Sequence, residues 1–256
     1  MDEPRRGTVH FIGAGPGDPD LITVRGRDLI ARCPVCLYAG SLVPRAVVAF
    51  APAGATVRNT ASLHLDQIVG LMADASAAGL DVARVHSGDP SLFGAIAEQM
   101  HRLDTLSVPY EVVPGVGSFQ AAAAALKLEL TPAGKNQTVI LTRAAGHTGL
   151  PNHENLAELA RHKTGMALFL SAAQMPEVAA ALTPHYGADA PVIVAYRVSW
   201  PDQLFIHCTL SEAPLRMAEA SITRTALILI GPMLDGSPAL ESKLYSSEYA
   251  HLFRKR

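Results

Sequence analysis

The chain has 256 residues, of which 49% are apolar and 17% are charged, and its formal net charge is −2 at pH 7. A chain of this length suits one large or two small folded domains. Its charged share is below the usual figure of about 25%, and this composition excludes a disordered chain. The small net charge excludes a broad basic field for nucleic acid or an anionic membrane, and no apolar run approaches the ~20 residues of a spanning helix.

Strand and helix patterns alternate through the first half of the chain. Short apolar runs predict strands at 9–12, 35–38, 82–86 and 110–113. Apolar residues at helical spacing predict helices at 21–32, 65–72, 92–103 and 118–128. Repeated strand–helix units of this kind predict a parallel sheet with helices on its faces.

The composition changes at residues 131–137 (TPAGKNQ), a polar segment rich in turn formers, which we interpret as a linker. We therefore expect an N-terminal α/β domain over residues 1–133 and a C-terminal α/β domain over residues 134–256. Beyond the linker the patterns predict strands at 138–141, 166–170, 192–196, 205–209 and 226–230. Only two helices, near 177–182 and 212–220, interrupt these strands, which predicts a mixed sheet.

Three glycine-rich turns each follow a predicted strand of the first domain. They span residues 13–19 (GAGPGDP), 87–90 (SGDP) and 113–118 (VPGVGS). We expect Asp18 and Asp89 each to cap a helix that begins at the proline after it. Because parallel strands end at the edge of the sheet where α/β proteins bind ligands, the three turns predict one ligand site.

The first turn looks like a dinucleotide fingerprint but departs from it in three ways. Its spacing is G-x-G-x-G, and Asp18 lies where a pyrophosphate needs bare amides at a helix N-terminus. The acidic residue that binds ribose is missing after the second strand, where residues 37–40 read LYAG. A nicotinamide-dependent dehydrogenase is therefore kept only as an alternative.

Cys33 and Cys36 have redox spacing, but they precede a strand instead of opening a helix, so we expect two buried thiols. The 3 cysteines exclude a disulfide framework, and no apolar signal-peptide core follows Met1, so we expect a cytoplasmic protein. No cluster of cysteine and histidine has zinc spacing, and we expect no metal site.

Three further residues stand at the ends of predicted strands. His86 ends a strand beside the Gly88 turn, where a half-buried histidine with a backbone partner is the ordinary outcome and a substrate contact is the alternative. Arg143 and Arg197 end strands of the second domain. They are either solvated charges or, if they face a cleft, suited to binding carboxylates.

Taken together, these residues resemble the tetrapyrrole (uroporphyrinogen/corrin) methyltransferase family. The match runs in order through 9–23, 87–94, 113–116 and 225–231, nearly the whole chain. Within the family the likeness is greatest to members that methylate carbon 11 of precorrin-4 in cobalamin biosynthesis, through segments 38–43, 86–92, 137–143, 196–202 and 241–245. Members that act on uroporphyrinogen usually carry Asp where Gly40 stands here, which argues against that substrate.

The resemblance implies two α/β domains with the active site in the cleft between them, S-adenosylmethionine as methyl donor, S-adenosylhomocysteine as product, and a homodimer. It also implies cofactor contacts, matched by position, at Pro16, Ser87, Gly88, Asp89, Phe93, Gly117, Ser118, Leu170, Thr225 and Ala226. Many relatives have threonine where Gly117 stands, so this chain lacks that side-chain contact.

The implied substrate is a polycarboxylate, so a chain of net charge −2 must gather positive charge locally. Our candidates for this charge are Arg143, Arg197, Arg45 and Lys127, and the candidates for substrate contact are Arg143, Arg197, His86 and Tyr38. We expect positioning, and no obligatory acid or base, to dominate the chemistry. The sequence leaves open cobalt-precorrin-4 or another ring position as the target, and a non-catalytic protein that binds a tetrapyrrole or S-adenosylmethionine.

Overall fold

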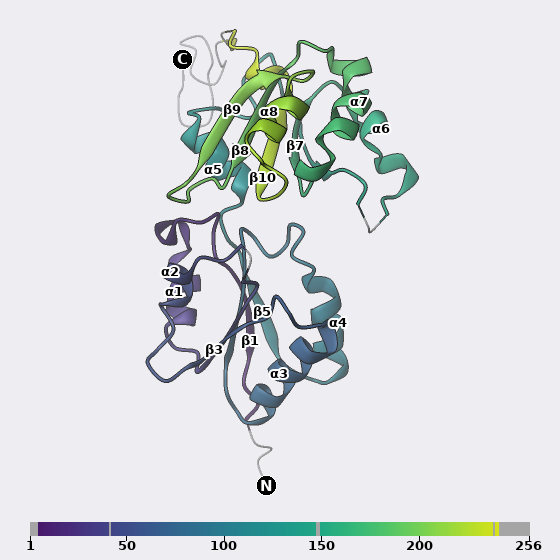
Figure 1. The fold of residues 1–256 in the computed structure, drawn as a ribbon. Helices are drawn as coiled ribbons and strands as arrows, with labels where there is room; N and C mark the ends of the chain where they lie inside the picture. The colour runs from purple at the N-terminus through teal and green to yellow at the C-terminus, as the bar shows by residue number, and fades with distance from the viewer. Residues whose placement is uncertain (1–4, 41, 147–148, 238, 241–256) are drawn as a thin grey trace, which may run out of the picture. The chain divides into compact units, whose positions relative to one another are not determined.

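The computed structural model describes residues 5–40, 42–146, 149–237 and 239–240 (Figure 1). The chain divides into two compact units, Met1–Ala121 with Val198–Pro201, and Ala122–Arg197 with Asp202–Arg256. The division between the units falls within helix α5 (Ser118–Ala125). The domain boundary that we predict between residues 133 and 134 stays a prediction.

The first unit is built on a parallel sheet of five strands in the order β3-β2-β4-β1-β5. The strands are β1 (Val9–Gly13), β2 (Val35–Tyr38), β3 (Thr56–Asn59), β4 (Val82–His86) and β5 (Tyr110–Val113). The parallel sheet and its four predicted strands are confirmed. Strand β3 was not predicted, because all of its residues are exposed at the sheet edge and no apolar pattern marks it.

Helices cover both faces of this parallel sheet (Figure 1). Helices α1 (Val24–Ile30) and α2 (Arg45–Val48) lie on one face, and α3 (Leu65–Ala77) and α4 (Ile96–Thr105) lie on the other. Successive side chains of β1 point to opposite faces of the sheet. Ile12 packs in the core that contains Leu29 of α1, and Phe11 packs in the core that contains Met72 of α3. Both faces of the central strands are therefore buried, as in other parallel sheets.

Two helices of the first unit begin later than the apolar spacing predicts. Asp18 and Pro19 do open a helical turn, but it is the short 3-10 helix η1 (Pro19–Leu21), and α1 begins separately at Val24. The helix predicted over 92–103 begins only at Ile96. Phe93 and Ala95 have left-handed φ angles of 56° and 49°, which an α-helix does not admit.

The second unit contains a mixed sheet in the order β6-β7-β10-β8-β9, in which β6 and β7 are parallel and the other neighbours antiparallel. The strands are β6 (Val139–Arg143), β7 (Gly165–Phe169), β8 (Pro191–Tyr196), β9 (Leu204–Thr209) and β10 (Ala226–Ile230). The helices are α6 (Leu156–Ala160), α7 (Met175–Tyr186) and α8 (Ala213–Glu219), with the 3-10 helices η2 (Asn152–Glu154), η3 (Ala172–Gln174) and η4 (Pro232–Leu234). The predicted mixed sheet is confirmed.

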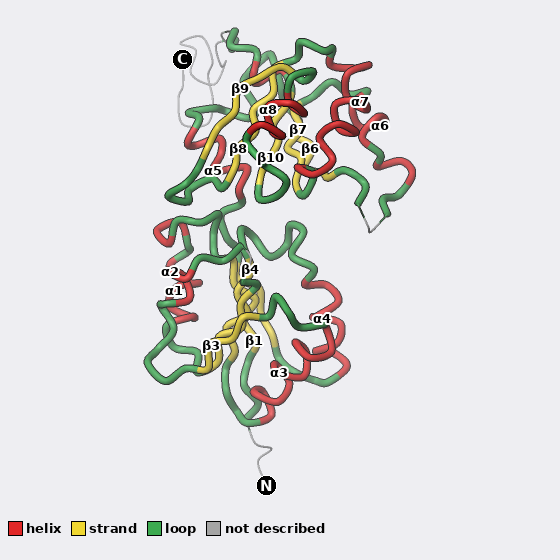
Figure 2. The backbone as a smooth tube through the Cα atoms, in the orientation of Figure 1, coloured by secondary structure: helices red, strands yellow, loops and turns green. Residues whose placement is uncertain are grey.

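One hydrophobic core joins α6, α7 and α8 to one face of the mixed sheet (Figure 2), through residues such as Leu156, Leu182, Met217 and Ile228. Helix α6 was not predicted, because its five residues are too few for a helical period to show. None of the described helices has the length and apolar character needed to cross a membrane.

The segment at residues 131–137 is held firmly by Asn136, which is only 3% exposed. The Asn136 side-chain amide donates to the carbonyl of Leu130 at 2.7 Å, and its oxygen accepts the N–H of Gly165 at 2.8 Å and the hydroxyl of Thr164 at 2.7 Å. The polar segment predicted as a linker is therefore hydrogen-bonded to the start of β7.

Candidate functional site

The three glycine-rich turns meet at the carboxyl edge of the parallel sheet, where β4, β1 and β5 are neighbours. Two of the turns pair backbone to backbone. The Gly88 N–H donates to the Gly15 carbonyl at 2.8 Å, and the Gly15 N–H donates to the Gly88 carbonyl at 3.3 Å. The prediction that the turns lie together at one edge is confirmed.

Most glycines in these turns make room for the protein's own atoms. A Cβ on Gly13 would lie 2.6 Å from the Cα of Gly115, and a Cβ on Gly115 would lie 2.1 Å from the carbonyl oxygen of Gly88. A Cβ on Gly17 would lie 2.3 Å from the ring of Trp200. These positions exclude any side chain because the backbone of another segment or an aromatic ring already fills the space.

Gly88 differs from the other glycines of the three turns, all of which are described. It has a left-handed φ of +60°, and the nearest atom to an added Cβ, the Cα of Gly117, is 3.9 Å away. Space for a ligand at the edge of the sheet is therefore open at Gly88.

Asp89 does not cap a helix, so the prediction that Pro90 opens one is wrong. One carboxylate oxygen of Asp89 accepts the N–H of Ser91 at 2.8 Å, and the other accepts the N–H of Gly115 at 2.9 Å. Burial raises the pKa of Asp89, but the hydrogen bonds from Ser91 and Gly115 outweigh it and hold that pKa below its ordinary value. The ionised carboxylate thus joins the second turn to the third.

Two buried polar side chains lie along β4. The guanidinium of Arg84, which is 4% exposed, donates to Gln99 at 3.1 Å and to Thr60 at 3.0 Å. Burial lowers the pKa of Arg84 to about 10, so the group remains charged at neutral pH. The sequence analysis did not predict this network. Arg84 is two residues from Val82 and two from His86, so its side chain lies on the same face of the sheet as theirs.

His86 is 5% exposed, and its Nε2 atom has no hydrogen-bond partner among the described residues. This differs from the half-buried histidine with a backbone partner that its place in the sequence suggests. Burial, with a smaller effect from the charge of Arg84, lowers the pKa of His86 to about 3. The imidazole is therefore neutral at pH 7 and carries no positive charge.

We predict that His86→Gln flattens the dependence of stability on pH. The pKa of about 3 in the folded chain lies below the ordinary 6.5, so the unfolded chain binds more protons between these values. The contribution of His86 is complete above pH 6.5 and is lost as the pH falls toward 3. Urea unfolding between pH 6.5 and 4.5 should show a wild-type free energy that falls more steeply than that of His86→Gln, by up to about 1.4 kcal/mol per pH unit.

The matched control is His153→Gln, because the side chain of His153 is 82% exposed. This variant should keep the wild-type slope. Equal slopes for wild type and His86→Gln would contradict the assignment of a buried neutral imidazole.

The residues predicted for the second unit gather at one edge of its mixed sheet. Ala226 pairs with Tyr196, and Ile228 pairs with Leu168, so continuing the register sets Leu170 opposite Ala226. The N–H of Arg197 donates to the carbonyl of Thr225 at 3.0 Å. The segments that meet here are the ends of β7 and β8 and the start of β10.

Backbone strain marks the same edge. Leu170, Arg197 and Thr225 have φ angles of 53°, 44° and 57°, although none of them is glycine. A left-handed residue of this kind costs on the order of 1–3 kcal/mol and persists where its surroundings hold it, commonly at ligand sites. Leu170 is also 66% exposed, which is unusual for a leucine held in a strained conformation. These features favour a functional role for this edge.

Arg143 and Arg197 lie at the same edge, on either side of Leu170 and Thr225. Arg143 ends β6 and donates to the carbonyls of Ala144 and Gly149, while Arg197 follows β8 and forms an ion pair with Asp202 at 2.8 Å. Strands β7 and β10 separate them, so their backbones lie roughly 14 Å apart at the usual strand spacing. The edge thus carries two arginines, one on each side of β7 and β10.

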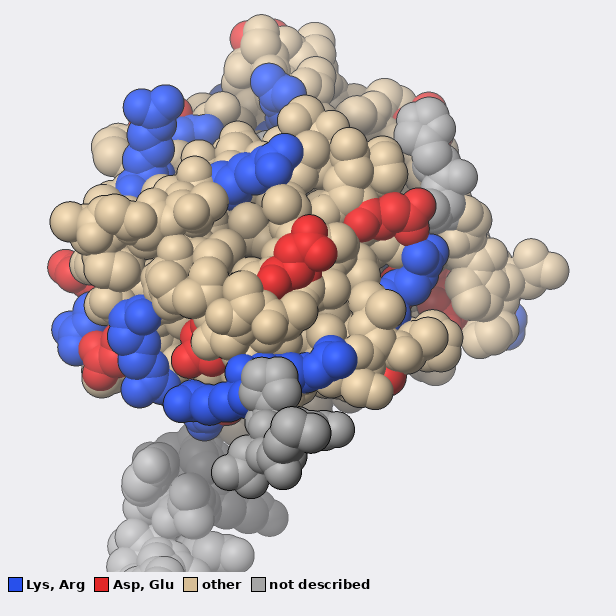
Figure 3. Space-filling view, turned by 90° about the horizontal axis from the view of Figure 1, so that it is seen from below, with Lys and Arg blue, Asp and Glu red and all other residues tan. Residues whose placement is uncertain are grey.

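The remaining candidates lie elsewhere in their units. Tyr38 ends β2 and is half-buried, Arg45 begins α2 and Lys127 follows α5, both exposed. On the face drawn in Figure 3, the described basic and acidic side chains are interspersed among uncharged residues. Positive charge for a polycarboxylate is therefore not gathered on that face.

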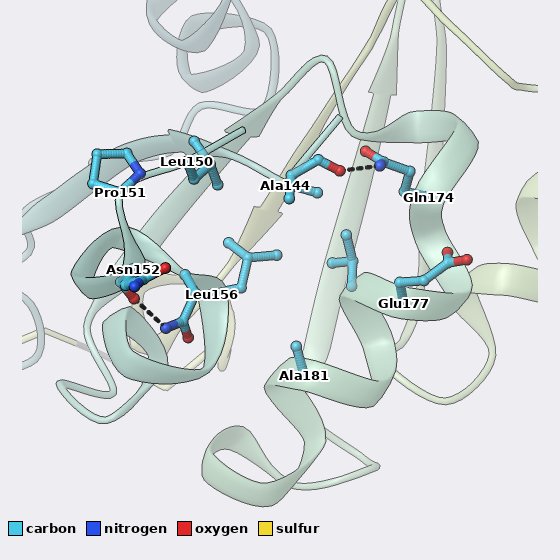
Figure 4. A pocket seen from close by; sticks show the side chains of 11 residues that line it. Ala144, Leu150, Pro151, Asn152, Leu156, Gln174, Glu177 and Ala181 are labelled. Carbon is cyan, nitrogen blue, oxygen red and sulfur yellow. Dashed lines mark hydrogen bonds between the residues drawn. The ribbon is translucent and has the colours of Figure 1, made fainter. Parts of the chain in front are cut away.

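A cavity of about 610 Å³ lies in the second unit, between the segment after β6 and helix α7 (Figure 4). Its lining is mainly apolar, with Leu150, Leu156 and Val178, and Glu177 contributes a carboxylate. The Gln174 amide donates to the carbonyl of Ala145 across its rim. The cavity contains none of the residues predicted for cofactor or substrate contact.

The cysteine prediction is confirmed for Cys33 and Cys36, which are both buried free thiols. Burial raises the pKa of Cys33 to about 12 and that of Cys36 to about 11, so both are protonated and unreactive at neutral pH. Segment 241–245, which contributes to the family resemblance, lies outside the described residues, as does Ser41.

Comparison with known families decides the assignment. The model of the family "Tetrapyrrole (Corrin/Porphyrin) Methylases" matches residues 8–214. The chain belongs to this family. The family resemblance inferred from the sequence is thereby confirmed.

Relatives of this tetrapyrrole methylase match over nearly their full lengths. Precorrin-4 C(11)-methyltransferase of Pseudomonas aeruginosa is 53% identical, over 96% of this chain and 98% of the relative. A solved cobalt precorrin-4 methyltransferase is 45% identical with a TM-score of 0.86, over 89% of this chain and 96% of that one. Uroporphyrin-III C-methyl transferase of Thermus thermophilus was solved with S-adenyl homocysteine. It is 28% identical with a TM-score of 0.75, over 90% of this chain and 94% of that one. The predicted two-domain α/β fold is confirmed.

Proposed function

We propose that this tetrapyrrole methylase transfers a methyl group from S-adenosylmethionine to carbon 11 of precorrin-4, giving precorrin-5 in cobalamin biosynthesis. The observation that carries the proposal is the 53% identity to a precorrin-4 C(11)-methyltransferase across almost the whole of both chains. The two sheet edges support it, because one has open space among backbone groups and the other carries two arginines.

The carboxyl edge of the parallel sheet fits the methyl donor. S-adenosylmethionine carries an activated methyl group on a positively charged sulfur, and it has no phosphate. Its adenosine and amino-acid ends call for backbone donors and acceptors, which the turns offer beside the open space at Gly88. The contacts that we propose are Pro16, Ser87, Gly88, Asp89, Phe93, Gly117 and Ser118 from the first unit, and Leu170, Thr225 and Ala226 from the second.

The substrate is a polycarboxylate, and we assign its recognition to Arg143 and Arg197. Two guanidinium groups at separate strand ends suit the carboxylates of different side arms of one macrocycle. Tyr38 and His86 are further candidates for contact. His86, as a neutral buried imidazole, would contribute a hydrogen bond and not a charge.

The chain's part in the reaction is to hold the two reactants. The ring carbon must lie in line with the methyl group at roughly 3–3.5 Å, a task for the shape of the site. Exclusion of water keeps the donor from side reactions. We assign no residue as an obligatory acid or base.

A second candidate substrate is cobalt-precorrin-4. The observation in its favour is the solved cobalt precorrin-4 methyltransferase, which matches this chain with a TM-score of 0.86. Its sequence identity of 45% is lower than the 53% of the relative named for the metal-free substrate. We therefore place the metal-free ring first.

Incubation of the purified protein with carbon-13 methyl-labelled S-adenosylmethionine and precorrin-4 tests the proposal. We expect S-adenosylhomocysteine to form and NMR to locate the label on carbon 11. Turnover only with the cobalt-containing ring would favour the second substrate, and label on another carbon would indicate a different ring position. Binding of both ligands without any S-adenosylhomocysteine would identify a carrier and contradict the proposal.

Gly88→Val should lower the affinity for S-adenosylmethionine by roughly tenfold or more, because a side chain fills the open space at the carboxyl edge. Calorimetric titration measures the affinity. Valine is also strained at the φ of +60°, so the control is Gly54→Val, whose φ of +88° imposes similar strain in a loop that precedes β3. The control should bind the donor normally. Equal losses in both variants would attribute the effect to strain and remove Gly88 from the site.

Arg143→Ala should raise the KM for the tetrapyrrole by roughly tenfold, the effect of losing one charge-assisted hydrogen bond. The Kd for S-adenosylmethionine should stay within about twofold, since we assign this arginine to the substrate alone. Steady-state kinetics and calorimetry measure the two constants. Arg161→Ala, which removes an exposed arginine after α6, is the control and should change neither. A parallel loss of both affinities would count against the assigned role.

We also infer from the family resemblance that the enzyme works in the cytoplasm as a homodimer, without a nucleic-acid or membrane partner. Light scattering of the purified protein measures its molecular mass in solution and so tests the dimer.

A further inference from the structure

A short segment of the β8–β9 connection is bound to the first glycine-rich turn. Residues Val198–Pro201 belong to the first unit, although the chain on both sides of them belongs to the second. The backbone N–H of Asp18 donates to the hydroxyl oxygen of Ser199 at 2.9 Å. The indole N–H of Trp200 donates to the carbonyl of Pro16 at 3.0 Å. Two side chains from late in the chain thus bind both ends of the Pro16–Asp18 backbone.

Gly17, the residue between these two contacts, is covered by the tryptophan ring. A Cβ at Gly17 would lie 2.3 Å from Cδ1 and 2.4 Å from Nε1 of Trp200, and 3.0 Å from the hydroxyl of Ser199. The indole therefore packs directly on the backbone at the position where glycine is required. The two hydrogen bonds and this packing together form a clasp, by which we mean the contacts of Ser199 and Trp200 with residues 16–18.

The segment that carries the clasp contains non-glycine residues with left-handed φ angles. Ser199 has a left-handed φ of 67°, and Val198 before it is 5% exposed and anchors the segment. At the base of the connection, Arg197 is also left-handed and pairs with Asp202 at 2.8 Å. Two strained residues within three positions indicate that the surroundings fix this conformation, and such strain is concentrated at functional sites.

The turn that the clasp holds is the one that carries Pro16, a proposed contact of the methyl donor. Without the clasp, the turn would keep its other hydrogen bonds, which include the Gly15–Gly88 backbone pair and the bond from the Asp20 N–H to the Asp18 carboxylate, but it would lose both bonds to Ser199 and Trp200. A turn held at fewer points samples more conformations, and binding must then restrict it at a cost in free energy. A turn that is already held in place avoids that cost.

We propose that Ser199 and Trp200 are positioning residues for the methyl donor, which hold the first glycine-rich turn in its binding conformation. The proposal rests on the proposed function, because it takes S-adenosylmethionine as the ligand of that turn. Neither residue is assigned a contact with the reacting atoms. Their effect is expected in the affinity for the donor and not in the recognition of the tetrapyrrole.

The first test removes each hydrogen bond separately. Trp200→Phe keeps an aromatic ring over Gly17 but lacks the N–H, and Ser199→Ala lacks the hydroxyl oxygen. Calorimetry should show the Kd for S-adenosylmethionine raised about 5- to 10-fold in each variant, as for the loss of one intramolecular hydrogen bond. At saturating donor, kcat and the KM for the tetrapyrrole should stay within about twofold, which a general loss of structure would not allow. Ser211→Ala, at an exposed serine after β9, is the control and should bind like wild type.

The second test needs no variant, because Trp200 is the 1 tryptophan of the chain. Its emission maximum should not shift as S-adenosylmethionine is added, because the clasp is already formed before the donor binds. A shift of the maximum that shows the indole moving on binding, or unchanged Kd in both folded variants, would overturn the role of the clasp while leaving the proposed function intact. Failure of the wild-type protein to bind the donor by calorimetry would instead overturn the proposed function, and this proposal with it.

Discussion

The contact of backbone with backbone among Gly13, Gly88 and Gly115 is the constraint on which the candidate site depends. Parallel strands bring the ends of β1, β4 and β5 to one edge, but side chains at Gly13 and Gly115 would keep the following turns apart. Without them, the turns pack directly on one another, and the Asp89 carboxylate links the second to the third. The edge thus becomes a surface of backbone amides and carbonyls, which a ligand without phosphate can use.

The two units offer different kinds of edge. In the first unit the edge is made of glycine-rich turns, whose charged residues are Asp18 and Asp89. In the second unit the edge contains non-glycine residues in left-handed conformations, and it carries Arg143 and Arg197. Under the proposed function, the first edge is the candidate site of the donor and the second the candidate site of the substrate. This division would let a chain whose net charge is only −2 bind a polycarboxylate.

The sequence was a good guide wherever burial determines structure. Strands such as β1 and β10 are buried throughout and were predicted within a residue, whereas the exposed edge strand β3 carries no apolar pattern and was missed. The glycine-rich turns were correctly placed at one edge, because the topology of a parallel sheet requires it. The helix predicted from residue 92 failed for a different reason, since Phe93 and Ala95 are left-handed and the spacing of apolar residues does not reveal such φ angles.

The contacts of Trp200 with the first turn have a consequence for how the chain can be divided. The chain that leaves the first unit at Ala121 returns to it only at Val198. A fragment ending at Ala121 would keep every strand of the parallel sheet, yet it would leave the Gly17 backbone uncovered and the Pro16 carbonyl without its indole donor. The first unit is therefore complete only after β8 has been made, so during synthesis the first glycine-rich turn reaches its final form long after the parallel sheet.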